Sequence, residues 1–175
     1  MCSIITHPVV PISIAAMFPN ESITPPILLA GAICSVIPDL DVIGFSFGVR
    51  YGDMLGHRGL THSILFAVLL AALVTYILAD RIGGFSLVPF TFLFVSTLSH
   101  GILDAFTNGG LGVAFFSPFQ NERYFFPWRP IAVSPIGVAR FFSDTGLRVL
   151  WSELRWVWFP FGIVYVISHM LKSYR

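Results

Sequence analysis

The 175-residue chain has a net charge of +1, 11% charged residues, 55% hydrophobic residues and a mean hydropathy of +0.81. This composition lies outside the range of soluble domains and indicates a protein embedded in a membrane. Because Lys172 is the single lysine, no basic cluster favours nucleic-acid binding, and the length suits one domain over residues 1–175.

The first two apolar stretches, residues 8–18 and 25–37, are each about half as long as a membrane span. The polar sequence PNESIT lies between them. This pattern predicts a short N-terminal helical hairpin whose two outer ends lie on the same side of the membrane. The alternative is one irregular span together with a segment lying in the interface.

Three further stretches are candidates for spanning helices. Residues 60–79 contain about the twenty apolar-dominated residues that a span needs, and residues 85–106 follow after the tight link DRIGG. Residues 156–171 begin with Trp156 and Trp158, which suit a membrane interface. The sequence therefore predicts an all-α polytopic membrane protein with antiparallel helices: the short hairpin plus about three spanning helices.

Residues 107–155 form a long connection that is rich in aromatic residues and arginine. The aromatic content argues against disorder. We therefore expect this loop to lie on the membrane surface and to cap one face of the helices. Arg123 and Arg129 flank its aromatic stretch YFFPW.

Histidine and aspartate side chains fall at the ends of the predicted helices. If successive segments alternate in direction, seven of these side chains meet at one membrane face. They are His7, Asp39, Asp41, His57, His62, His100 and Asp104. Imidazole and carboxylate groups are common zinc ligands, and seven of them exceed one tetrahedral site. The sequence thus predicts two divalent ions, zinc with manganese or iron as alternatives, in an arrangement suited to hydrolysis at phosphorus.

Two of the motifs have spacings that favour shared ligation. His100 and Asp104 are four residues apart, so on a helix they share one face about one turn apart. Asp39 and Asp41 follow Pro38, which ends or bends the preceding helix, and could bind two ions or bridge them. An acid such as Asp104 inside an apolar span is costly and is usually paired or functional.

The segment GHRGLTHS contains two histidines that one continuous helix cannot bring together. His57 and His62 are five residues apart, which is roughly 140° around an α-helix. We expect Gly59 to interrupt the chain and Thr61 to cap a helix that begins at His62. His57 is then a loop ligand and His62 a first-turn ligand.

Plainer explanations exist for each residue taken singly. A histidine near a membrane interface is often only hydrogen-bonded, and Asp39 and Asp41 could simply end a helix. Arginines such as Arg58 could face solvent or headgroups, or they could clamp a substrate phosphate. His169 is predicted to lie at the opposite membrane face and is left out of the site.

Together with His7, the motifs PDLD, HRGLTHS, SHGILDAFTNGG and PWRPIAVSPIG resemble the YdjM/YbcI-type family of bacterial inner-membrane proteins. Members of this family are described as candidate membrane-bound metal-dependent hydrolases. The resemblance covers about residues 5–137 and has no gap at any ligand position. More distantly, the His-x-x-x-Asp pair is similar to the zinc-dependent phospholipase C and P1-nuclease group. This chain lacks that group's second His-x-x-x-Glu pair, which leaves a third metal and the exact reaction open.

The expected function is a membrane-bound hydrolase that acts on a phosphate ester or phospholipid through a metal-activated water. Asp41, Asp104 and Arg58 are the expected catalytic residues, and Arg58, Arg123 and Arg129 the expected substrate-binding residues. Membrane lipid is the expected environment and possible substrate. The alternatives are a lipid ester or amide hydrolase, a metal transporter, and a non-enzymatic metal-binding protein.

The distribution of basic residues bears on orientation in the bacterial inner membrane. Segments on the predicted site side contain Arg50, Arg58, Arg123, Arg129, Arg140, Arg148 and Arg155, whereas the opposite side contains Arg81, Lys172 and Arg175. Cytoplasmic loops carry an excess of Lys and Arg. The count therefore favours a cytoplasmic site.

Overall fold

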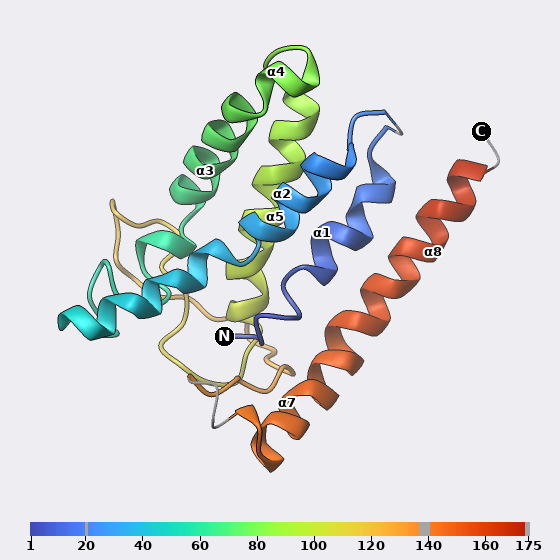
Figure 1. The fold of residues 1–175 in the computed structure, drawn as a ribbon. Helices are drawn as coiled ribbons and strands as arrows, with labels where there is room; N and C mark the ends of the chain where they lie inside the picture. The colour runs from blue at the N-terminus through green and yellow to red at the C-terminus, as the bar shows by residue number, and fades with distance from the viewer. Residues whose placement is uncertain (20, 137–140, 174–175) are drawn as a thin grey trace.

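The structure is a computed structural model that describes residues 1–19, 21–136 and 141–173. Across these residues the regular elements are helices, and extended pairing is limited to the isolated bridges Thr107–Ile131 and Val113–Tyr124. Figure 1 shows the helices side by side, with the loops gathered around the lower end of α5. The predicted all-α class of a polytopic membrane protein is confirmed.

The N-terminal region forms two helical arms, and the second arm is longer than predicted. The first consists of α1 (Val9–Ile14) and the 3-10 turn η1 (Ala15–Met17). The second consists of α2 (Pro25–Cys34) and the 3-10 helix η2 (Ile37–Phe47), which together make a 23-residue candidate span. Pro38 does not end this arm, because it lies in the first turn of η2, where its missing N–H is tolerated.

The next helical pair is α3 (Ile64–Ile77) and α5 (Leu87–Ala105), joined by the short α4 (Ala79–Ile82). The predicted start of α3 is wrong by two residues. Ser63, not Thr61, caps the helix, because the Ser63 hydroxyl accepts a hydrogen bond from the Phe66 N–H at 3.1 Å. His62 consequently lies in the 3-10 turn η3 (Leu60–His62), and α3 has 14 residues, about 21 Å, where a longer span was expected.

The last helix begins earlier than predicted. It comprises α7 (Asp144–Glu153), a π-helical segment η4 (Leu154–Trp158) and α8 (Phe159–Ser173). The interpretation of residues 144–155 as loop is therefore wrong. This first part reads DTGLRVLWSE, which is too polar to be recognised as a span from hydropathy, although the stretch Asp144–Lys172 is long enough to cross a membrane.

Close helix packing positions the segments that carry the ligand residues. α5 packs between α2 and α3, and α1 packs against α8 (Figure 1). Gly31 of α2 permits this approach, since a Cβ there would lie 2.4 Å from Cε1 of the buried Phe92 in α5. Small residues at such contacts are typical of membrane helices.

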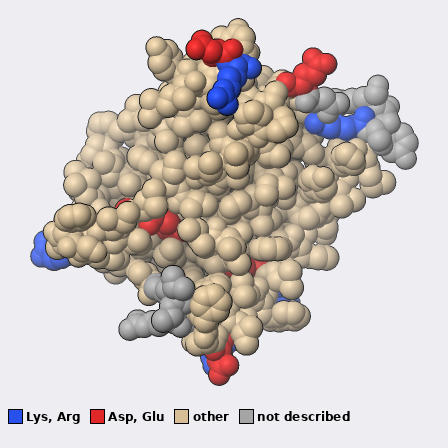
Figure 2. Space-filling model, in the orientation of Figure 1, with Lys and Arg blue, Asp and Glu red and all other residues tan. Residues whose placement is uncertain are grey.

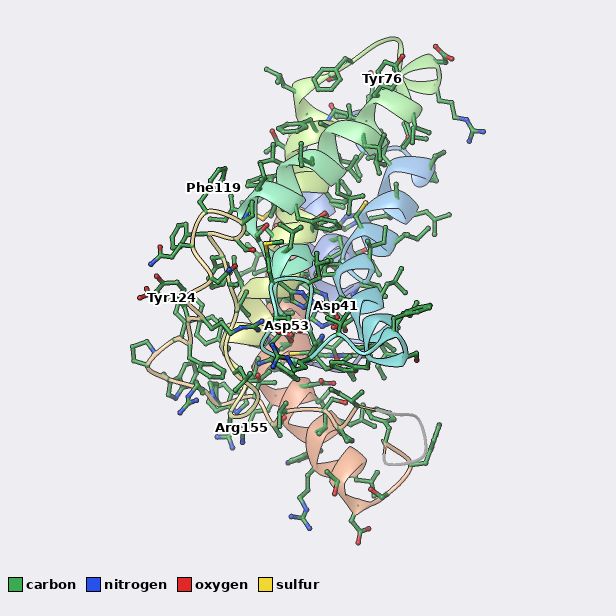
Figure 3. All side chains as sticks on the ribbon, turned by 90° about the vertical axis from the view of Figure 1, so that its left-hand side faces the viewer. Asp41, Asp53, Tyr76, Phe119, Tyr124 and Arg155 are labelled. Atoms are coloured by element: carbon green, nitrogen blue, oxygen red, sulfur yellow. The ribbon has the colours of Figure 1, made fainter. Side chains whose placement is uncertain are left out.

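The surface agrees with a membrane environment. In Figure 2 charged side chains are few and lie mainly near the edges of the visible face, and most of that face is uncharged. In Figure 3 Tyr76 lies near one end of the molecule, far from Asp41, around which the loops gather. The described part of the predicted cap packs onto the lower end of α5, where the Phe106 and Phe126 rings stack with their centroids 4.1 Å apart.

Candidate metal centre

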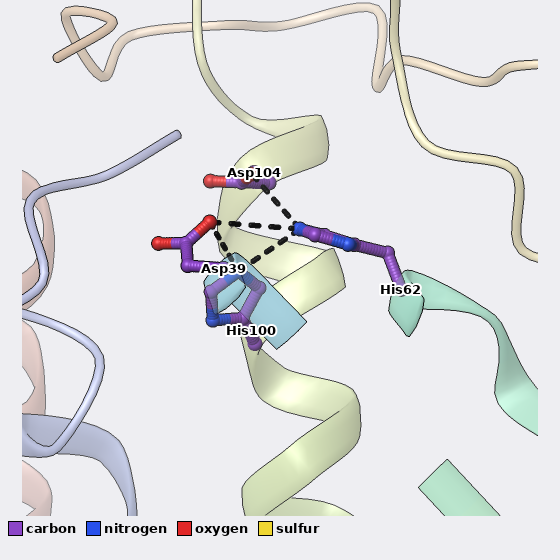
Figure 4. A group of neighbouring side chains, drawn as sticks. All are labelled: Asp39, His62, His100 and Asp104. Atoms are coloured by element: carbon purple, nitrogen blue, oxygen red, sulfur yellow. Dashed lines mark hydrogen bonds and ion pairs between the residues drawn. The ribbon is translucent and has the colours of Figure 1, made fainter. Parts of the chain in front are cut away.

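Four of the predicted ligands meet at the lower end of α5. His100 and Asp104 lie one turn apart on this helix, while Asp39 comes from η2 and His62 from η3. Each can offer one donor atom so that all four atoms lie within 4.8 Å of one another. Figure 4 shows the four side chains converging on one point.

Short distances define this group. His62 Nε2 lies 3.1 Å from His100 Nε2, and His100 Nε2 lies 3.3 Å from Asp39 Oδ1. His62 Nε2 is also 3.8 Å from Asp39 Oδ1 and 3.7 Å from Asp104 Oδ2. Two imidazole nitrogens and two carboxylates thus face one another from three separate segments.

His7 adds a fifth side chain. Its Nε2 lies 4.0 Å from Asp39 Oδ2 and 4.0 Å from Asp104 Oδ1. The His7 ring stacks on the His100 ring, with the centroids 3.7 Å apart. We call His7, Asp39, His62, His100 and Asp104 the primary cluster.

Several polar atoms in this region are buried without a hydrogen-bond partner. They are both ring nitrogens of His7, both carboxylate oxygens of Asp39, and Nε2 of His57. Leaving such atoms unsatisfied inside a protein costs free energy, so each one requires an explanation. Imidazole nitrogen and carboxylate oxygen are ordinary zinc ligands. A divalent cation in the primary cluster would satisfy the Asp39 oxygens and His7 Nε2, which faces Asp39 and Asp104.

A hydrogen bond outside the primary cluster fixes the tautomer of His100. Its Nδ1 lies 2.7 Å from the backbone carbonyl oxygen of Ser35. Since a carbonyl can only accept, Nδ1 donates and Nε2 keeps its lone pair toward Asp39 and His62. Metal-binding histidines almost always have such a partner on the other ring nitrogen.

A second group contains Asp41, His57 and the shared His62. In contrast to Asp39, Asp41 is already well hydrogen-bonded. Its Oδ1 lies 2.7 Å from His57 Nδ1, and its Oδ2 accepts from the Thr61 hydroxyl at 2.7 Å and the Arg58 N–H at 3.2 Å. Asp41 therefore orients His57 and leaves His57 Nε2 without a partner.

Burial lowers the pKa of two of the histidines, whereas the Asp39 and Asp41 carboxylates outweigh burial at His62 and raise its pKa to about 9. Burial lowers the pKa of His7 to about 3, with the neighbouring His100 acting in the same direction. Burial also lowers the pKa of His57, although the hydrogen bond to Asp41 opposes the shift. Neutral imidazole is the form that binds metal.

Arg58 is completely buried and has a left-handed backbone conformation, with φ of 65°. Its Nε donates to Asp104 Oδ2 at 2.9 Å, and its other nitrogens donate to Thr107 Oγ1 and the Gly109 carbonyl, each at 2.9 Å. The sequence suggested that this arginine binds substrate. The structure places it against Asp104 and the start of the loop.

The other two candidate substrate-binding arginines differ from each other. Arg123 donates to the backbone carbonyls of Tyr51, Asp53 and His57, and so holds the loop that carries His57. Arg129 is exposed, and its guanidinium carbon lies 4.6 Å from the ring centroid of Phe125. All seven predicted metal ligands are brought together, whereas Arg129 lies on the surface of the cap and His169 stacks on Tyr165 in α8.

Sequence reasoning missed one buried acid beside the N-terminal segment, Glu153. Glu153 falls within the predicted loop 107–155, but it is the last residue of α7 and is fully buried. An acid within the tryptophan-rich stretch WSELRWVW was the available signal, because acids near apolar spans are usually paired or functional.

Comparison with known proteins gives a family but no solved relative. A family profile described as YdjM inner membrane protein matches residues 1–174. The Inner membrane protein YbcI of Escherichia coli (strain K12) is 42% identical over 160 residues, which cover 91% of this chain and 92% of that protein. No solved structure matches. The chain belongs to the YdjM inner membrane protein family, as the motifs suggested.

Proposed function

From this membership and the site geometry, we propose that the protein is a membrane-bound, metal-dependent hydrolase whose ion binds in the primary cluster. The observation that carries the proposal is the set of buried nitrogen and oxygen atoms of His7 and Asp39 that have no hydrogen-bond partner and could bind a metal. They lie beside the inward-facing Nε2 of His100. A divalent ion held there supplies Lewis-acid activation of water for hydrolysis.

The residues around the primary cluster take distinct roles. Arg58 and the Cys2 N–H, which donates to Asp104 Oδ1 at 2.7 Å, orient Asp104. Asp41 orients His57, whose unpartnered Nε2 is a better proton acceptor than either aspartate named from sequence. A second ion would use Asp41, His57 and His62, and Asp41 would then have to exchange its present hydrogen bonds.

The proposed substrate is a phosphate ester carried by a lipid. The loop beside the site exposes Phe119 and Trp128, at 86% and 58%, and aromatic side chains of this kind suit the headgroup layer. Arg129 is the arginine of the three whose guanidinium lies on the surface of this loop, so it is the candidate for the substrate anion.

The test uses purified protein with phospholipid in mixed micelles. Phosphate release and fatty-acid release are measured separately, after chelation and after restoring Zn²⁺, Mn²⁺ or Fe²⁺. We expect metal-dependent release of the phosphate-containing headgroup, and none from Asp39→Asn. Fatty-acid release alone would favour a lipid ester or amide hydrolase instead.

Complete burial supports a second candidate function, a structural metal site. His7, His100 and Asp104 are all 0% exposed, and structural zinc sites are closed to solvent whereas catalytic ones keep an open position. In that case chelation would lower the unfolding temperature sharply and no substrate would be turned over. A hydrolase retains metal-dependent turnover in the same preparations.

We propose that the site faces the cytoplasm. In Figure 1 α4 and the C-terminal end of α8 both lie toward the end of the molecule opposite the loops, although apart from each other, so Arg81 and Lys172 are on the far side. Arg140 and Arg175, which are also among the basic residues counted for orientation, lie outside the described residues.

The orientation can be tested with a cysteine that replaces the exposed Phe119. This cysteine should not react with a membrane-impermeant maleimide in intact spheroplasts and should react after lysis. Labelling in intact spheroplasts would reverse the orientation.

A further inference from the structure

Glu153 lies in a second buried polar cluster, formed with the N-terminal segment. Its carboxylate accepts hydrogen bonds from the Ser3 N–H, from the Ser3 hydroxyl at 2.5 Å and from the Thr6 hydroxyl at 2.8 Å. The carboxylate is fully buried, and the recorded hydrogen bonds of this described side chain come from these two residues. A buried acid whose partners all lie in one short segment fixes the position of that segment.

Of the residues that flank Ser3 and Thr6 in sequence, Cys2 contacts the primary cluster and His7 belongs to it. Cys2, next to Ser3, donates its N–H to Asp104 Oδ1 at 2.7 Å. Thr6 immediately precedes His7, whose Nε2 has no hydrogen-bond partner and lies 4.0 Å from both Asp39 Oδ2 and Asp104 Oδ1. The turn between Ser3 and Thr6 is closed by the Thr6 N–H, which donates to the Ser3 carbonyl at 2.9 Å.

The π-helical segment explains how the last helix reaches Thr6 from two positions. Glu153 and Trp158 are five residues apart, which on an α-helix would separate them by about 140°. The segment Leu154–Trp158 instead forms a wider turn, closed by the Phe159 N–H on the Leu154 carbonyl. As a result the Trp158 indole N–H donates to Thr6 Oγ1 at 2.8 Å, while the Thr6 hydroxyl donates to Glu153.

We propose that Glu153 is a positioning residue of the metal site, acting with Trp158 through Thr6 to hold His7 against Asp39 and Asp104. The inference rests on the proposed metal site but not on any hydrolytic activity. Partners that orient metal ligands are worth about 10- to 100-fold in metal affinity when they are removed. Glu153 therefore controls metal affinity although it is not itself a ligand.

The test is the Zn²⁺ affinity of the full-length protein in detergent, measured by competition with a chromophoric chelator. Glu153→Gln and Thr6→Val should each weaken binding about 10- to 100-fold. Thr6→Ser, which keeps the hydroxyl, should lack this 10- to 100-fold loss and bind Zn²⁺ about as tightly as wild type. The matched control is Glu122→Gln, because Glu122 is an exposed acid whose partners are Gln120 and Tyr124.

A double-mutant cycle separates positioning from a general loss of stability. If Glu153 acts through His7, then His7→Ala and His7→Ala/Glu153→Gln should bind Zn²⁺ equally weakly, because the second change has nothing left to position. Unchanged affinity in Glu153→Gln, or losses that multiply in the double variant, would overturn the inference. If Glu153→Gln does not fold, Thr6→Val and Thr6→Ser provide the same comparison. A wild type that binds no Zn²⁺ would remove the proposed metal site and the inference together.

Discussion

Arg58 and Asp104 form a fully buried ion pair, with Arg58 Nε 2.9 Å from Asp104 Oδ2 and both side chains 0% exposed. The pair joins the GHRGLTHS segment to the last turn of α5, and so it connects two segments that carry metal ligands. Two further bonds from Arg58, to Thr107 and Gly109, tie the same guanidinium to the loop that follows α5.

Removing this arginine should destabilise the protein. Arg58→Leu removes the closer of two cations beside the buried Asp104, leaving the Met1 amino group at 3.8 Å. Removing one partner of a buried ion pair costs about 3 to 5 kcal/mol in comparable cases. The matched control is Arg50→Leu, which breaks an Arg–Asp pair of similar length, 3.0 Å, in which the arginine is 86% exposed. Thermal unfolding in detergent should therefore show a large drop for Arg58→Leu and almost none for Arg50→Leu. Equal drops would show that burial of the Arg58 pair is unimportant.

The two aspartates of PDLD should differ in their effect on metal binding. Asp39 has two buried, unpartnered oxygens, whereas Asp41 accepts hydrogen bonds from His57, Arg58 and Thr61. Asp39→Asn should therefore abolish metal binding, and Asp41→Asn should weaken it by about 10- to 100-fold without changing the number of ions. Titration with Zn²⁺ measures both quantities. Loss of one of two ions in Asp41→Asn would instead establish the two-ion site expected from the sequence.

Packing between α2 and α5 should be sensitive to a single added methyl group. Gly31→Ala places a Cβ 2.4 Å from Phe92 Cε1, and the ring must move to avoid it. Overpacking of this kind costs about 1 to 3 kcal/mol. Gly162→Ala in α8 is the control, since its Cβ meets nothing within 4 Å. The expected result is a lower unfolding temperature for Gly31→Ala alone; identical temperatures would contradict the close contact.

The parts of the site that follow helical periodicity were predictable from the sequence. His100 and Asp104 are four residues apart in one apolar helix, and the structure places both in the primary cluster. The convergence of His7, Asp39 and His62 on that cluster follows from the alternating direction of the segments. These inferences need only the helical repeat and the direction of each segment.

Other features depend on contacts between distant residues, and no local pattern reports them. Ser63 and Thr61 are both acceptable caps, and the choice between them depends on how the GHRGLTHS turn folds. The sequence does not reveal that Arg58 pairs with Asp104, because the two residues are 46 positions apart. Glu153 falls in the predicted loop because α7 is too polar for hydropathy to reveal the start of the last helix.

Metal content of the purified protein tests the central claim most directly. Inductively coupled plasma mass spectrometry would measure the metal content of wild type, of His100→Ala and of Glu122→Gln, the control at an exposed acid. Unfolding curves would confirm that each protein is folded. The account predicts a stoichiometric divalent ion in wild type and in Glu122→Gln, and its loss in His100→Ala, because His100 Nε2 faces the centre of the primary cluster. Folded wild-type protein that contains no divalent ion, and takes up none from Zn²⁺, Mn²⁺ or Fe²⁺, would contradict it.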